Sequence, residues 1–269
     1  MELAEIRTYP VKSAKGVLRP SAQVLPWGLE GDRRWAVMDP LGEVIWVGEH
    51  PQLLSVSAAE TPEGGLLLSA EGMGELKVPP AAGEAIPIGF PNVDRAVLAH
   101  ADAHEWFTRL LGKPARLIWL AEPTGRTATE EHGGLPGSFV WDAPLLLVSR
   151  SSLKRLDDWI AEGAMERQEH PPAPLDMARF RPNAVIDGAE PFAEDTWTSV
   201  RIGDIDFRVL ELCDRCAATT WDPATQDRGK EPLRTLARHR RWNGMTWFGI
   251  RLAPRNLGEL RVGDEVRPS

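Results

Sequence analysis

Cysteine is scarce in this chain. Of its 269 residues only two are cysteines, Cys213 and Cys216, and they lie close together. An iron–sulfur cluster needs about four cysteine thiolates, and a zinc ribbon needs four ligands, usually two C-x-x-C pairs or one such pair with two close histidines. The composition therefore leaves no room for a cluster and argues against a zinc ribbon. Two neighbouring cysteines are also typical of a reducing compartment.

The sequence also lacks an excess of positive charge and any long apolar run. Its 31 lysines and arginines against 39 acidic residues give a net charge of −8, which is the wrong sign for binding a phosphate backbone. No apolar run approaches the ~20 residues that cross a bilayer, and residues 1–5 do not resemble the start of a signal peptide. We therefore expect a cytoplasmic protein that binds neither nucleic acid nor membrane.

Glycine and proline are abundant, with 24 and 23 residues, and this frequency indicates many turns between short strands. Amphipathic spacing predicts helices only near residues 101–111, 151–162 and 232–239. Alternating or apolar runs predict strands elsewhere, among them residues 3–11, 43–47, 53–58, 143–148 and 205–212. The expected fold class is a β-rich α+β protein: a β-barrel with added helices and, before it, an N-terminal β-barrel-like domain.

This length allows one large or two modest domains, and we predict two. Residues 1–121 are predicted to form the N-terminal barrel-like domain, which includes the helix near 101–111. Residues 122–269 form the second domain. The polar segment 122–142 is long for a loop, which is typical of a segment that covers a site or marks a boundary.

The two cysteines follow a predicted strand. Ile205, Phe207 and Val209 alternate with polar residues, a tight turn at 203–204 comes before them, and the cysteines stand at the far end. The neighbouring Arg215 is expected to favour the thiolate of Cys216, which is the form that binds metal or attacks. The residues alone leave three alternatives open: two small core residues, a disulfide, or half of a structural zinc site.

Other polar residues are suited to an anion. Lys12 and Ser13 follow the first strand and could hold a phosphate, although they are also ordinary loop residues. Ser149, Ser151 and Ser152 stand at the start of the predicted second helix, where one serine should cap it and the free N–H groups would attract an anion. Further along the chain, Arg181 and Asn183 come just before a predicted buried strand.

Several motifs together resemble a known family. They are F-R-P-N at 180–183, A-E-D-T-W at 193–197, C-D-R-C-A-A-T-T-W-D-P at 213–223 and R-V-G-D-E-V at 261–266. This set is similar to the MOSC domain, which is named for the C-terminal part of molybdenum-cofactor sulfurases. Y-P-V-K-S at 9–13 and G-D-R-R-W at 31–35 resemble the β-barrel domain that precedes it. In order and motifs the chain is most similar to the mitochondrial amidoxime-reducing component and its bacterial relatives.

The resemblance implies a molybdenum cofactor, that is, molybdopterin carrying molybdenum. Cys216 would be the protein ligand to the metal and Cys213 would not, and Asp195 would lie nearby as a second catalytic residue. The residues implied for holding the pterin and its phosphate are Lys12, Ser13, Arg33, Ser149, Ser151, Arg181 and Asn183. Their chemistry agrees, because a phosphate accepts hydrogen bonds from cationic and hydroxyl donors and a soft metal centre prefers a thiolate.

The implied activity is reduction of small N-hydroxylated compounds such as amidoximes and hydroxylamines, with the metal cycling between Mo(VI) and Mo(IV). The alternative is a carrier of cofactor or sulfur without reductase activity. Because the sequence shows no dinucleotide fingerprint, no ferredoxin-like extension after Val266 and no membrane anchor, we expect a separate reductase or donor protein to supply electrons. The chain departs from the family pattern at 46–51, where it has W-V-G-E-H-P. Relatives usually carry Thr-x-Arg-Gln before this proline, so a basic residue of the pocket is absent here.

Overall fold

The computed structural model describes residues 1–91, 93–125 and 134–269, so part of the predicted loop 122–142 lies outside the described residues. The chain divides into two compact units. One consists of Met1–Arg7, Leu18–Val24 and Leu145–Ser269, and the other consists of Thr8–Val17 and Leu25–Pro144. The first unit therefore takes two segments from the beginning of the chain. The boundary at residues 121 and 122 stays a prediction.

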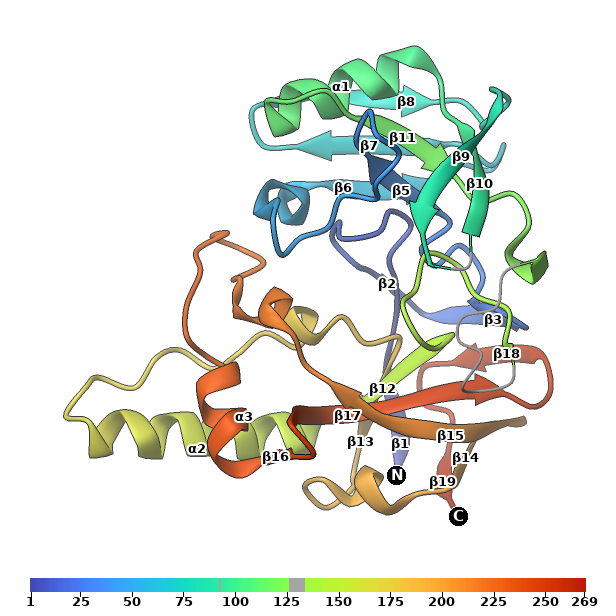
Figure 1. Cartoon of the computed structure of the whole chain (residues 1–269). Coiled ribbons are helices and arrows are strands. Elements are labelled where there is room, and N and C mark those ends of the chain that lie inside the picture. Colours follow the sequence, from blue (N-terminus) through green and yellow to red (C-terminus); the bar gives the residue numbers. More distant parts are fainter. Residues whose placement is uncertain (92, 126–133) are drawn as a thin grey trace. The chain divides into compact units, whose positions relative to one another are not determined.

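The first unit is built on a nine-stranded sheet, whose neighbours follow the order β19-β14-β15-β17-β12-β13-β1-β2, with β16 paired to β17 (Figure 1). Its strands are β1 (Glu2–Thr8), β2 (Val17–Arg19), β12 (Leu145–Ser149), β13 (Ala184–Asp187), β14 (Ser199–Ile202), β15 (Ile205–Asp214), β16 (Arg241–Trp242), β17 (Met245–Pro254) and β19 (Val266–Pro268). A separate ladder joins β3 (Ser21–Leu25) to β18 (Gly258–Arg261).

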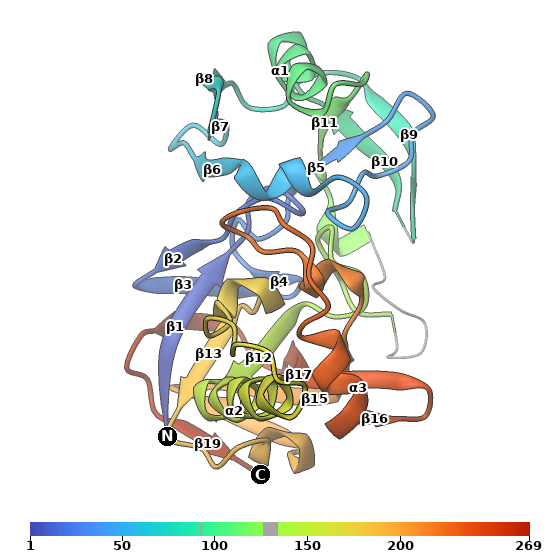
Figure 2. The ribbon, with the colours of Figure 1, turned by 90° about the vertical axis from the view of Figure 1, so that its left-hand side faces the viewer.

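Two helices accompany this sheet. α2 (Arg150–Glu166) connects β12 to β13, which run parallel to each other, and it packs on both strands (Figure 2). α3 (Leu233–His239) packs against α2 and β17. Leu156 and Ile160 lie one turn apart on α2 and are buried with Phe180 and Phe248, as the helical spacing predicts. Three short 3₁₀ turns complete the unit: η3 (Met177–Phe180), η4 (Ala193–Thr196) and η5 (Ala217–Thr220).

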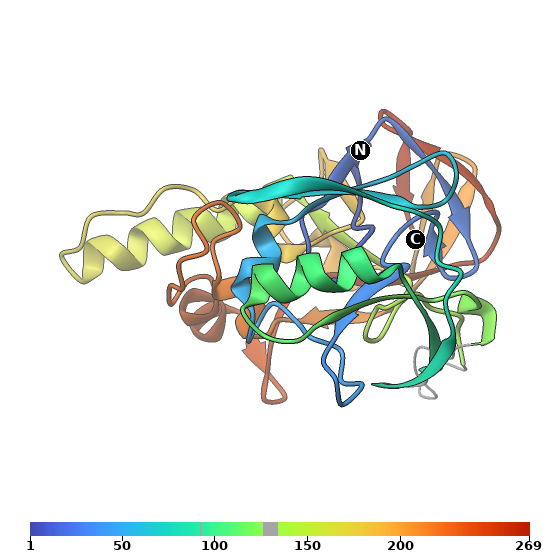
Figure 3. The ribbon, with the colours of Figure 1, turned by 90° about the horizontal axis from the view of Figure 1, so that it is seen from above.

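The second unit contains two small antiparallel sheets and one helix. One sheet has the order β5-β11-β10-β9 and the other the order β6-β7-β8. Their strands are β5 (Trp35–Met38), β6 (Ser57–Glu60), β7 (Leu66–Ala70), β8 (Met73–Val78), β9 (Ala85–Phe90), β10 (Val93–Leu98) and β11 (Arg116–Trp119). The short strand β4 (Gly28–Leu29) lies outside these two sheets, and the 3₁₀ turns are η1 (Pro51–Ser55) and η2 (Pro123–Gly125). α1 (Ala101–Leu111) packs on β11 and β8 (Figure 3).

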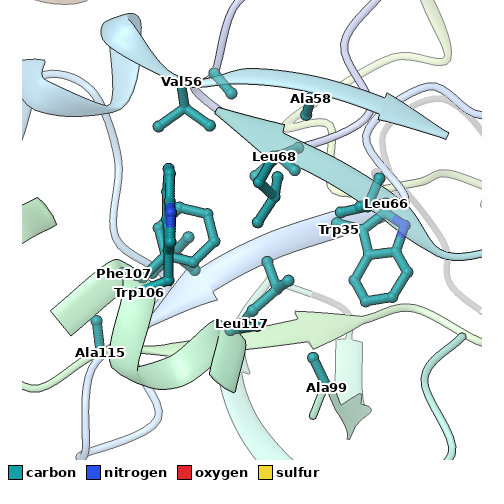
Figure 4. Packing of buried hydrophobic residues seen from close by; sticks show 14 of the residues in the cluster. Trp35, Val56, Ala58, Leu66, Leu68, Ala99, Trp106, Phe107, Ala115 and Leu117 are labelled. Carbon is teal, nitrogen blue, oxygen red and sulfur yellow. The ribbon is translucent and has the colours of Figure 1, made fainter. Parts of the chain in front are cut away.

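The core of the second unit lies beneath α1. Trp106 and Phe107 point from this helix toward Leu68 of β7 and Leu117 of β11, and all four side chains are buried (Figure 4). Gly112 ends the helix in a left-handed conformation, with φ of 66°, which glycine adopts without steric cost. The helical spacing in the sequence and the C-terminal glycine thus both agree with the structure.

The β-rich α+β prediction is confirmed, since strands dominate and the described residues form three α-helices, each within a few residues of its predicted position. None of the described helices is both long and apolar enough to cross a membrane. The tight turn at 203–204 is also confirmed, because β14 and β15 pair directly across it.

Two predicted strands are wrong, one of them only in part. Residues 43–47 form no strand, and only Glu43 and Val44 make isolated bridges. The strand predicted at 53–58 is wrong for its first three residues, which lie in η1, because Pro51 supplies the φ angle that starts a helical turn. Its last two residues do belong to a strand, β6. Short apolar runs do not distinguish a strand from a buried turn, which is the source of both errors.

Replacing the buried Phe107 by alanine should leave a cavity beneath α1. We expect Phe107→Ala to lower the free energy of unfolding by about 3–5 kcal/mol, measured by urea denaturation. The control is Leu41→Ala, because Leu41 is 88% exposed and its loss should change stability by less than about 0.5 kcal/mol. Equal effects of the two substitutions would contradict this account of the core.

Candidate functional site

The two cysteines differ in environment. Cys213 is buried near the end of β15, whereas Cys216 is exposed, and both thiols are free. The backbone at Cys216 is fixed by η5, because the amide and the hydroxyl of Thr219 both donate to the Cys216 carbonyl, at 3.1 and 3.0 Å. The structure thus contains no disulfide between them, and it presents one thiol on a well-held turn.

Arg215 contacts Cys213 and not, as expected from the sequence, Cys216. Its Nη1 donates to Cys213 Sγ at 2.9 Å and its Nη2 donates to the Phe180 carbonyl at 2.7 Å. The reason is the period of extended backbone, in which residues two apart face the same side. The guanidinium of Arg215 is thus directed to Cys213, and its effect on the thiol of Cys216 stays a prediction.

The segment that carries Arg181 is attached to the cysteine segment. Arg179 donates to the Thr219 carbonyl at 3.3 Å and pairs with Asp222 at 2.7 Å, so η3 is tied to η5 and to the turn that follows. Burial raises the pKa of Asp222, but backbone N–H donors and Arg179 outweigh it and hold the pKa below its ordinary value. Within the first unit the structure thus brings the Arg181 and Cys216 segments together.

Asn183 is buried and binds the backbone of two strands. Its Oδ1 accepts from the Leu146 amide and its Nδ2 donates to the Arg7 carbonyl, each at 3.2 Å. These bonds tie β12 to β1, and they give Asn183 a structural role beside β13. The cofactor-binding role implied by the resemblance stays a prediction.

The serines at the start of α2 do not cap it as predicted. Ser149 occupies the N-cap position but makes no side-chain capping bond in the described structure, and its Oγ lies 2.7 Å from Ser151 Oγ. Ser152 Oγ instead donates to Glu194 at 2.7 Å and accepts from the Phe192 amide at 2.8 Å. The N-cap serine therefore leaves the first N–H groups of α2 available to an anion.

Two acidic residues follow each other in η4, of which Glu194 is buried and Asp195 is partly exposed. Glu194 is fully buried, burial raises its pKa, and its Oε2 has no hydrogen-bond partner among the described residues. Burial also raises the pKa of Asp195, although Arg240 opposes this shift from 2.6 Å. Sequence reasoning missed Glu194 and Arg240, although the A-E-D-T-W motif contains the acidic pair.

Lys12 and Ser13 lie in the second unit, on a segment that pairs with β5. The Lys12 ammonium donates to the Phe139 carbonyl at 3.0 Å and stands 4.9 Å from the centre of the Phe90 ring. Ser13 is buried, and its hydroxyl accepts from the Val47 amide at 3.1 Å. Both side chains are thus held by contacts within the second unit.

Arg33 belongs to the same group. Its guanidinium pairs with the buried Asp32 and lies 4.5 Å from the centre of the Tyr9 ring. The Arg33 carbonyl accepts from the amide of Phe139 at 2.8 Å, and Phe139 also holds Lys12. The structure therefore brings Lys12, Ser13 and Arg33 into one neighbourhood of the second unit.

Three of the predicted cofactor residues share an unusual backbone conformation. Ser13, Arg33 and Arg181 have φ angles of 69°, 51° and 56°. This left-handed region costs a residue with a side chain about 1–2 kcal/mol, and it persists only where surrounding contacts over-determine it. Such strain clusters at functional sites, so the backbone conformation marks Ser13 and Arg33 within the second unit and Arg181 within the first.

Comparison with known families identifies the class of protein. The profile of the MOSC domain matches residues 129–267, and that of the MOSC N-terminal beta barrel domain matches residues 1–114. The chain belongs to the MOSC family, in the class that joins a MOSC domain to this N-terminal barrel.

Individual relatives are similar over nearly the whole chain. Molybdenum cofactor sulfurase of Oryza sativa subsp. japonica is 30% identical over 100% of this chain, which spans only 36% of that protein. Mitochondrial amidoxime reducing component 2 of Homo sapiens is 31% identical over 98% of this chain and 82% of its own length. Among solved structures, the YuaD protein from Bacillus subtilis covers 98% of this chain and 93% of its own, with 10% identity and a TM-score of 0.42.

The buried Glu194 predicts a pH effect on stability. Because its pKa in the fold lies above the ordinary 4.5, the stability that it contributes is present below that value and is lost as the pH rises through the raised pKa. Glutamine keeps an oxygen for the Ser152 hydroxyl and does not ionise. We expect Glu194→Gln to gain stability relative to the wild type between about pH 5 and about pH 8, measured by urea denaturation.

The matched control is Glu190→Gln, which changes an exposed glutamate of the same loop. It should show no pH-dependent difference from the wild type. If Glu194→Gln is less stable than the wild type by the same amount at both pH values, Glu194 is ionised in the fold and the account is wrong.

Proposed function

We propose that this chain is a molybdenum-cofactor-dependent reductase of N-hydroxylated compounds, with Cys216 as the protein ligand to molybdenum. The observation that carries the proposal is the difference between the two thiols. Cys213 is buried and its Sγ accepts a hydrogen bond from Arg215, whereas Cys216 is exposed and its Sγ has no hydrogen-bond partner in the described part of the chain. An accessible thiolate is the ligand that a soft metal centre prefers.

The donor set of the first unit fits the cofactor. Arg181 offers a cation on the segment attached to Cys216, and the start of α2 offers N–H groups beside the hydroxyls of Ser149 and Ser151. These donors suit a pterin phosphate. We assign Lys12, Ser13 and Arg33 of the second unit to the same cofactor, together with Asn183.

When bound, the cofactor would supply the two electrons that, together with two protons, break the N–O bond of the substrate and release its oxygen as water. The chain itself contributes binding, orientation and a proton. Cys216 holds the metal, and Arg181 with the serines orients the pterin. Asp195 is the proposed proton donor, because burial raises its pKa and its buried Oδ1 has no partner among the described residues, while Oδ2 is paired with Arg240.

The relatives favour two candidate functions. Similarity to mitochondrial amidoxime reducing component 2 over 82% of that protein supports the reductase. Similarity to molybdenum cofactor sulfurases over about a third of their length supports the second candidate, a carrier of cofactor or sulfur. Catalytic turnover of an N-hydroxylated substrate with an electron donor distinguishes them, since a carrier should show none.

The two cysteines provide a test within one chain. Cys216→Ala should lose the metal–sulfur bond and the reductase activity, while the phosphate contacts can still retain some pterin. Cys213→Ser should keep its molybdenum and most of its activity, because a serine oxygen can accept the hydrogen bond from Arg215. Both variants are made in a cofactor-producing host, and molybdenum content and N-reduction rates are measured. Equal losses in both, or an active Cys216→Ala, would contradict the proposal.

The electron source provides a second test. Purified holoprotein with NADH or NADPH alone should leave benzamidoxime unreduced, because the sequence shows no dinucleotide fingerprint. Adding reduced methyl viologen should start turnover, measured as benzamidine formation. Turnover with the nicotinamide alone would show that the chain obtains electrons directly and needs no donor protein.

A further inference from the structure

We propose that the surface formed by residues 228–245, which ends in the β16–β17 hairpin, is the docking surface for an acidic electron-donor protein. The inference rests on the proposed reductase function and names the face of the molecule that the donor contacts. Three observations carry it: the charge of this segment, the exposed apolar side chains at its tip, and its connection to Cys216.

The charge of the segment is opposite to that of the whole chain. Residues 228–245 contain six arginines and lysines and one acidic residue, in a chain with a net charge of −8. Arg234, Arg238 and Arg240 are neutralised by ion pairs. Three exposed cations, Arg228, Lys230 and Arg241, make no ion pair in the described structure. Arg228 and Lys230 precede α3, and Arg241 follows it at the start of the hairpin. An excess of positive charge along one segment of a negatively charged protein steers an acidic partner toward that segment.

The hairpin tip adds an apolar contact of fixed shape. Trp242 and Met245 are cross-strand partners and remain 39% and 50% exposed. Asn243 and Gly244 form the turn with φ angles of 53° and 78°, and the Trp247 indole N–H donates to the Trp242 carbonyl at 3.1 Å. Exposed tryptophan and methionine beside arginine are enriched in protein interfaces.

The hairpin is also attached directly to the residue before Cys216. The Arg215 amide donates to the Thr246 carbonyl at 2.8 Å, and the Thr246 hydroxyl donates to the Arg215 carbonyl at 3.1 Å. Gly244 is two residues from Thr246, which corresponds to about 7 Å of strand. In Figure 2 β16 lies beside α3, on the first unit, which also carries the thiol. A donor that docks here is brought close to the ligand of the metal.

The charge could also attract an anionic lipid surface, since basic and aromatic side chains bind there as well. The connection to Cys216 favours the donor protein, because electron transfer requires a short distance to the metal and lipid binding does not. The two occupants are separated in the experiment.

The experiment compares hairpin variants with matched variants at the other end of β17. Arg241→Glu and Trp242→Ala change the hairpin, while Arg255→Glu and Leu257→Ala change an exposed arginine and an exposed leucine of the β17–β18 loop. The probe donors are a plant-type [2Fe–2S] ferredoxin and a flavodoxin, each reduced enzymatically. The rate of benzamidoxime reduction by the holoprotein gives kcat/KM for each donor, at about 50 and about 300 mM salt.

We expect at least one probe donor to reduce the wild type, with a kcat/KM that falls as salt rises. Arg241→Glu should lower kcat/KM for that donor by about tenfold or more at low salt and weaken its salt dependence. Trp242→Ala should lower it at both salt concentrations. The two β17–β18 loop variants should match the wild type, and all variants should keep their molybdenum and their rate with reduced methyl viologen.

Four results would overturn the inference. The hairpin variants could match the loop variants, or the wild type could use viologen but neither donor protein. The hairpin variants could lose viologen-driven turnover as well, which would assign the hairpin to the substrate site. The wild type could bind phosphatidylserine vesicles through Arg241 while donor kinetics stay unchanged, which would assign it to a lipid surface. Absence of viologen-driven turnover in the wild type is a separate failure, since it overturns the proposed function itself.

Discussion

The bridge made by Arg215 is the interaction on which the arrangement of the candidate site depends. One guanidinium binds Cys213 Sγ and the Phe180 carbonyl, so it fixes the end of β15 against η3 and engages one thiol while leaving the other accessible. A charged donor to sulfur and carbonyl is worth more than a neutral hydrogen bond. Because Cys213 is buried and hydrogen-bonded to Arg215, Cys216 is the accessible thiol of the pair.

Several of the proposed functional residues have features that cost free energy on folding. Ser13, Arg33 and Arg181 adopt left-handed backbone conformations, and Glu194 is a carboxyl with no exposed surface. Each feature opposes folding by itself. Such features persist where surrounding contacts maintain them, as the Val47 amide does at Ser13 and the Ser152 hydroxyl does at Glu194.

Features that depend on neighbouring residues could be predicted from the sequence, whereas contacts between residues far apart in the chain could not. The three helices were found because amphipathic spacing is a local property, and Gly112 marked the end of α1. The strand that leads to the cysteines, β15, could be predicted for the same reason. The first three residues of the strand predicted at 53–58 instead belong to a 3₁₀ turn that begins at Pro51. The predicted serine cap is absent because the hydroxyl of Ser149, the N-cap residue, lies against that of Ser151. The partner of Ser152 could not be predicted, because Glu194 is 42 positions away.

The sequence by itself determined the β-rich class, the positions of the helices and the family, because periodicity and motifs depend on residues that are close together in the chain. It also singled out the two cysteines. Only the tertiary structure decided which thiol is accessible, where Arg215 points and what Asn183 binds. Those outcomes depend on residues far apart in the chain, such as Arg215 with Phe180 and Asn183 with Arg7. Spacing in the sequence contains no information on which distant carbonyl a side chain will reach.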